Sequence, residues 1–94
     1  MDDLRDTAYA REMARATLDV PDGDVRIERL YVKGTQEEEI RFSWWPNGRM
    51  ANKPLDVPES MLLELIKRAI KQKVFKTEFL RQLKALLNGL SELD

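Results

Sequence analysis

Carboxylates are the most abundant side chains in this sequence that could do chemistry, and their densest run is Glu37-Glu38-Glu39. Two carboxyl groups placed on either side of a glycosidic bond can hydrolyse it without help from His or Cys. This run adjoins a predicted hairpin turn, however, and a chain of 94 residues is too small to build a sugar cleft around it. We therefore expect a solvated strand end here, and the sequence predicts no catalytic residue.

Other catalytic and metal-binding chemistries lack their usual residues. The chain has no Cys and no His, so disulfides, thiolate ligands and the commonest base near neutral pH are excluded. No serine lies in a nucleophile motif, and no glycine pattern matches a phosphate loop or a dinucleotide fingerprint. The three aspartates of segment 19–24 lack the ligand order of a calcium loop, which favours a turn. The sequence predicts a protein that is not an enzyme, with no cofactor and no metal.

The candidate partner-binding residues are Trp45, Asn47, Arg49 and Lys53, which follow Trp44 closely. Adjacent residues of a strand point to opposite faces, so one tryptophan ring is expected to face a partner or a covering helix. Trp and Arg are frequent at protein interface hot spots, and aromatic rings beside cations also suit nucleic-acid bases. Three interpretations stay open: both rings are buried by helices, the segment binds a protein, or it binds nucleic acid. If it is a recognition surface, the ring of Trp45 should be partly exposed.

A secondary candidate is a basic helix face formed by Lys67, Arg68 and Lys71. The N-terminal quarter of the chain is acidic and the C-terminal third is basic, although the net charge is only −1. A solvated face is the simplest interpretation, since Glu64 lies among these cations. The two ends could also complement each other, within the fold or across a contact between two copies. A third reading is a basic face for an acidic partner such as nucleic acid.

The elements that would position these residues form an α+β fold with the order α-β-β-(β)-α-α. A helix is expected near 3–18, because Asp2 or Asp3 could cap it, although its apolar stripe is narrow. Segments 25–32 and 38–45 are rich in β-branched and aromatic residues and predict an antiparallel hairpin. The turn signal Pro46-Asn47-Gly48 suggests a third strand at about 49–53.

Two C-terminal helices complete the prediction, near 59–74 and 77–88. Pro58 suits a first helical turn, and Thr77 suits an N-cap. Each segment carries one broad apolar face at helical spacing, and we expect these leucines and isoleucines to supply most of the core.

Size and composition place all this in one domain, 1–94, with 43% hydrophobic residues. No apolar run is long enough for a membrane span, and the acidic start does not read as a signal peptide, so we expect a cytoplasmic protein.

The preferred function is a non-enzymatic interaction module acting through protein contacts, including self-association as a homodimer. The alternative is a small nucleic-acid-binding protein that uses the Trp44–Lys53 turn and the basic helix face. A third is a subunit that completes an enzyme site on another chain. The composition suggests a prokaryotic or phage accessory protein.

Overall fold

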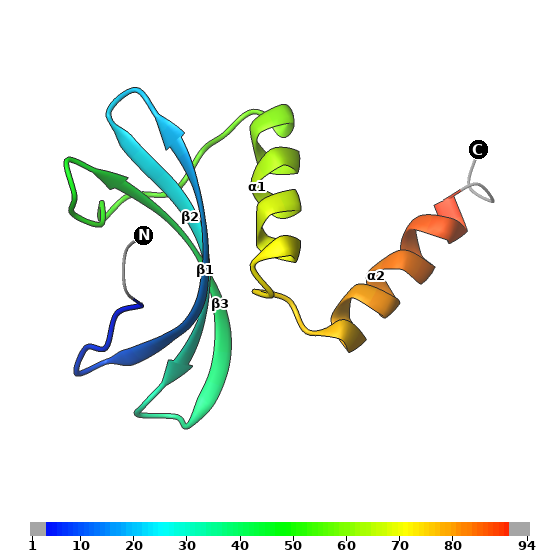
Figure 1. Cartoon of the computed structure of the whole chain (residues 1–94), viewed down its shortest axis with the longest axis horizontal. Helices are drawn as coiled ribbons and strands as arrows, with labels where there is room; N and C mark the ends of the chain where they lie inside the picture. The colour runs from blue at the N-terminus through cyan, green and yellow to red at the C-terminus, as the bar shows by residue number, and fades with distance from the viewer. Residues whose placement is uncertain (1–3, 91–94) are drawn as a thin grey trace.

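The computed structural model describes residues 4–90 and has three antiparallel strands followed by two helices (Figure 1). The strands are β1 (Ala10–Val20), β2 (Gly23–Val32) and β3 (Glu37–Pro46), and they lie side by side in that order. The helices are α1 (Glu59–Lys71) and α2 (Thr77–Gly89). The sheet is strongly curved, and its convex side faces α1 (Figure 1).

The predicted N-terminal helix is wrong, because its second half forms strand β1. Ala14, Ala16, Leu18 and Val20 alternate toward α1, which is strand spacing. Helix and strand patterns overlap in this stretch, and pairing with all of β2 decides in favour of the strand. The caps proposed at residues 2 and 3 lie outside the described residues. The element order is therefore β-β-β-α-α.

The third strand of the sheet is thus β1, and the segment predicted as a strand at 49–53 forms none. Asn47 and Gly48 do turn the chain, with φ of 55° and 80°. After them, the N–H of Arg49 donates to the carbonyl of Pro46 and that of Ala51 to the carbonyl of Trp44, and no ladder forms. Both sides of β2 are already paired, so a strand here could add only at the outer edge of β3. The chain instead crosses to the start of α1.

The central hairpin agrees with its prediction, with β2 and β3 each slightly longer than expected. Gly23, next to the turn between β1 and β2, has φ of 147°, and a Cβ there would lie 2.1 Å from the backbone oxygen of Trp45. Only glycine allows β3 to approach this closely. Strand β1 bulges at Met13, where its register with β2 shifts between Glu12 and Ala14.

The core lies between the convex side of the sheet and α1. Ile27 and Leu65 are fully buried there, with Ala16, Val25, Ala69 and Val74 around them. Helix α1 lies over β1 and β2, and β3 reaches the core at Trp44. One edge of the convex side is therefore left without a helix above it.

Helix α2 forms where it was predicted, but its expected place in the core is wrong. It has no buried residue, and within residues 4–90 it packs against neither the strands nor α1. In Figure 1 it stands away from the rest of the molecule. Neither helix, in the part of the chain that the structure describes, has the length and apolar character needed to cross a membrane.

Candidate functional site

The concave face of the sheet holds Trp45, whose ring is buried rather than partly exposed. The ring lies between two guanidinium groups, with Arg26 4.0 Å and Arg5 4.6 Å from its centre. Its Nε1 donates to Ser43 Oγ over 2.8 Å. Only 5% of the residue is accessible, so a partner could reach this ring only if the Arg5 segment moved aside.

A buried polar network continues from Ser43 along the same face. Ser43 Oγ donates to Glu28 Oε1 over 3.0 Å, and Arg41 donates to both oxygens of Glu28 over 3.0 and 3.1 Å. Beside it, Arg15 donates to both oxygens of Glu12 over 2.9 and 2.6 Å. Among residues 4–90, no buried side-chain nitrogen or oxygen lacks a partner.

The two carboxyl groups of this network titrate in opposite directions. Burial raises the pKa of Glu28, and the neighbouring Glu12 raises it further against the effect of Arg41. Burial also acts to raise the pKa of Glu12, but interactions with Arg15, with the Glu28 side chain and with the backbone N–H of Arg5 outweigh it and lower this pKa to about 2. Such a pair resembles a catalytic dyad, yet its oxygens are taken by arginine and serine donors. The geometry indicates a structural network that fixes the concave face.

The other candidates of the Trp-Arg segment are dispersed. Trp44 points to the convex side, where it packs on the edge of the core and, with Lys53, lines a cavity of about 490 Å³. Asn47 and Arg49 are exposed in the turn after β3. The structure therefore brings Lys53 to Trp44 and places Trp45 on the opposite face of the sheet.

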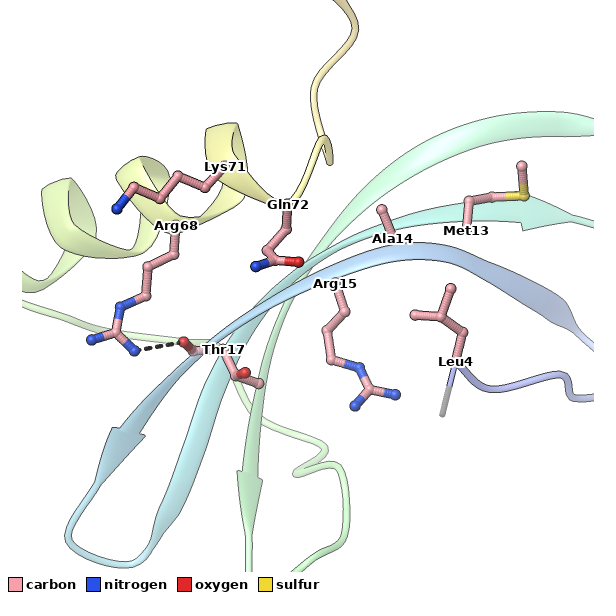
Figure 2. Close-up of a pocket in the computed structure, with 8 residues that line it drawn as sticks. All are labelled: Leu4, Met13, Ala14, Arg15, Thr17, Arg68, Lys71 and Gln72. Atoms are coloured by element: carbon pink, nitrogen blue, oxygen red, sulfur yellow. Dashed lines mark hydrogen bonds between the residues drawn. The ribbon is translucent and has the colours of Figure 1, made fainter. Parts of the chain in front are cut away.

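The basic face of α1 lies over the edge of β1, where a cleft of about 660 Å³ opens (Figure 2). Arg68 and Lys71 line it from α1, and Arg15 lines it from β1. Figure 2 shows Arg68 reaching the backbone of Thr17, whose carbonyl accepts its hydrogen bond over 3.0 Å. Lys67 is exposed but does not line the cleft.

The cations of this cleft are partly neutralised. Arg68 also donates to Glu64 over 3.0 Å, and this hydrogen bond lowers the pKa of Glu64. Arg15 is held by Glu12. Two of the three cations therefore already have a carboxylate partner, which weakens the cleft as a site for a phosphate group.

Two further groups of exposed large apolar side chains lie on α2 and on β3. Four exposed large apolar side chains lie on α2 or on the residue that follows it. We call them the α2 stripe: Phe79, Leu86, Leu87 and Leu90. Leu86 is 71% accessible. We define the bare β3 face as Ile40 and Phe42, which lie on the convex side beyond α1 and are 36% and 50% accessible.

Sequence reasoning missed these two surfaces for one reason. The stripe at helical spacing and the alternation of β3 are both present in the sequence, and both predict burial. What the pattern cannot give is the partner of each face. One signal was available: a single helix of 13 residues, such as α1, is too narrow to cover three strands.

Comparison with known proteins adds no family: neither a protein-family model, nor a curated protein, nor a solved structure matches the chain. Residues 4–90 also hold no group of three or more acidic side chains arranged to bind a metal ion. What is known of a site therefore comes from the geometry above.

Proposed function

We propose that this chain is a non-enzymatic interaction module that acts through protein contacts, with α2 as its contact element. The observation that carries the proposal is the state of α2, a helix of 13 residues that packs on no other element among the described residues and holds the α2 stripe in water. A helix this short is marginal alone in water, because most helix stability in proteins comes from packing of the apolar face. Large exposed apolar patches mark interaction sites.

Site-specific photocrosslinking in cells tests this function. A photoreactive residue at Leu86 should give discrete crosslinks to a protein, whereas one at Leu63 should give few. Leu63 is the matched control, because it is 70% accessible against 71% for Leu86 but lies on the outside of α1. Equal crosslinking from the two positions, or none from Leu86, would contradict the proposal.

The cleft beside β1 supports a second candidate, the binding of nucleic acid. Arg15, Arg68 and Lys71 line one cavity from two elements. The pairing of Arg15 and Arg68 with carboxylates makes this the weaker candidate.

A salt titration of binding to a labelled single-stranded oligonucleotide tests the second candidate. If the cleft contacts phosphates, Arg68→Ala with Lys71→Ala should make the salt dependence shallower by about 1.4 in log–log slope, whereas Arg49→Ala with Lys53→Ala should not. Unchanged binding in the first pair would remove the cleft from consideration.

A cytoplasmic location belongs to the same proposal. It is supported by a composition without Cys, which suits a reducing compartment. Fractionation of cells with an antibody to the chain checks it.

A further inference from the structure

The link between α1 and α2 is held in place, so α2 starts at a fixed point. Helix α1 ends with Lys73 at φ of 60° and with the N–H of Val74 donating to the carbonyl of Ala69 over 3.0 Å. Val74 is fully buried, and its own carbonyl accepts a hydrogen bond of 2.6 Å from Arg29 Nε. These contacts fix the point at which the chain leaves α1 toward α2.

Strand β3 holds the far end of the link through Glu38. The carboxylate of Glu38 accepts from Arg29 over 3.0 Å and from Lys76 over 3.5 Å. Phe75 packs on the core and touches the ring of Phe79, with 5.2 Å between the ring centres. Helix α2 therefore begins beside the sheet and runs away from it (Figure 1). To cover its own β3, it would have to reverse at Lys76 and break these contacts.

The charges near the α2 stripe and the bare β3 face are already paired within the chain. Glu38, which lies on the same side of β3 as Ile40 and Phe42, accepts from Arg29 and Lys76 of its own chain. The contact proposed below therefore rests on the apolar side chains.

The exposed area reaches the lower end of what a specific interface buries. We take roughly 200 Å², the value for an aromatic side chain, as an upper figure for each large apolar side chain. The α2 stripe and the bare β3 face then offer roughly 600 Å² per chain. Two chains would bury roughly 1,200 Å² in total, against about 1,200 to 2,000 Å² for a standard specific interface.

We propose, on the basis of the function proposed above, that the partner of α2 is a second copy of this chain. The α2 stripe of each chain packs on the bare β3 face of the other, in a two-fold dimer that exchanges α2. Both surfaces belong to the same sequence, so one symmetric contact covers two α2 stripes and two β3 faces at once.

Sedimentation equilibrium of the full chain tests the dimer. The wild type should have twice the mass of one chain. Leu86→Glu and Phe42→Glu should each raise the dissociation constant by about 10-fold or more, because each buries a charge in one half of the contact. Leu63→Glu, with equal exposure outside the contact, should leave it unchanged. Each variant should keep the strand signal of the wild type in circular dichroism. This control shows that a variant that has become monomeric is still folded.

Mixing the two disrupted variants sharpens the test. A Phe42→Glu chain keeps a good α2 stripe and a Leu86→Glu chain keeps a good β3 face, so the mixture should form heterodimers more strongly than either variant forms homodimers. Three results would overturn the exchange of α2. They are a monomeric wild type, a Phe42→Glu variant that dimerises as strongly as wild type, and a mixture in which heterodimers form no more strongly than homodimers. If the wild type is monomeric but Leu86 crosslinks to a different protein, the dimer fails while the proposed function stands.

Discussion

Helices α1 and α2 have apolar side chains at the same spacing, but α1 buries some of them against the sheet and α2 buries none. In α1, Leu65 and Ala69 are fully buried between the helix and the sheet. In α2, a stripe at the same helical spacing has no buried member, and Leu86 stands mostly in solvent. Amphipathic spacing therefore shows that a face needs a partner, and it does not show whether that partner lies in the same chain.

The largest loss of stability should come from truncation of a buried side chain of the sheet. Trp45→Ala is expected to cost about 3 to 5 kcal/mol of unfolding free energy, because it opens a large cavity between Arg5 and Arg26 and leaves Ser43 without its donor. Urea denaturation measures the cost. Phe42→Ala, three residues earlier on the same strand and half exposed, is the control and should cost less than half as much in the monomer. Similar costs for the two variants would contradict the buried position of Trp45.

Truncation of an α1 core residue should rank next. Leu65→Ala is expected to cost about 2 to 5 kcal/mol, because a fully buried aliphatic side chain loses its transfer energy and leaves a cavity. The same truncation in α2, Leu86→Ala, should change monomer stability by less than about 0.5 kcal/mol. Chemical denaturation at a concentration low enough to keep the chain monomeric makes the comparison. Equal costs would show that α2 belongs to the core after all.

The paired carboxylates of the concave face give a smaller, pH-dependent effect. The pKa of Glu12 is lowered to about 2, so its carboxylate stabilises the fold above its ordinary pKa of 4.5, and this stability is lost as the pH falls toward 2. Glu12→Gln should therefore cost about 1 to 3 kcal/mol at pH 7, where the Arg15 hydrogen bonds are weakened. The difference from wild type should shrink between pH 4.5 and 2 in denaturation curves. A difference that is constant with pH would contradict the lowered pKa.

The sequence predicted the local elements better than their partners. The hairpin of β2 and β3 and both helices were predicted because β-branched alternation and the helical stripes are local signals. Asn47-Gly48 does form a turn, but the third strand predicted after it does not form. The N-terminal helix was wrong, since the small residues of β1 suit a helix as well as an edge strand, and only pairing with β2 decides. The burial of Trp45 depends on Arg5, 40 positions away in sequence, which no local pattern reveals. The place of the basic face over β1 depended on tertiary packing in the same way.

Amide hydrogen exchange of the full chain, measured at two protein concentrations, tests most directly whether α2 is a contact element rather than part of the body. The amides of α1 and β2 should be protected equally at both concentrations, because their burial is within one chain. The amides of α2 should exchange quickly in the dilute sample and become protected in the concentrated one, and Leu86→Glu should abolish that gain. Protection of α2 equal to that of α1 at both concentrations would contradict the account, as would a gain that survives in Leu86→Glu.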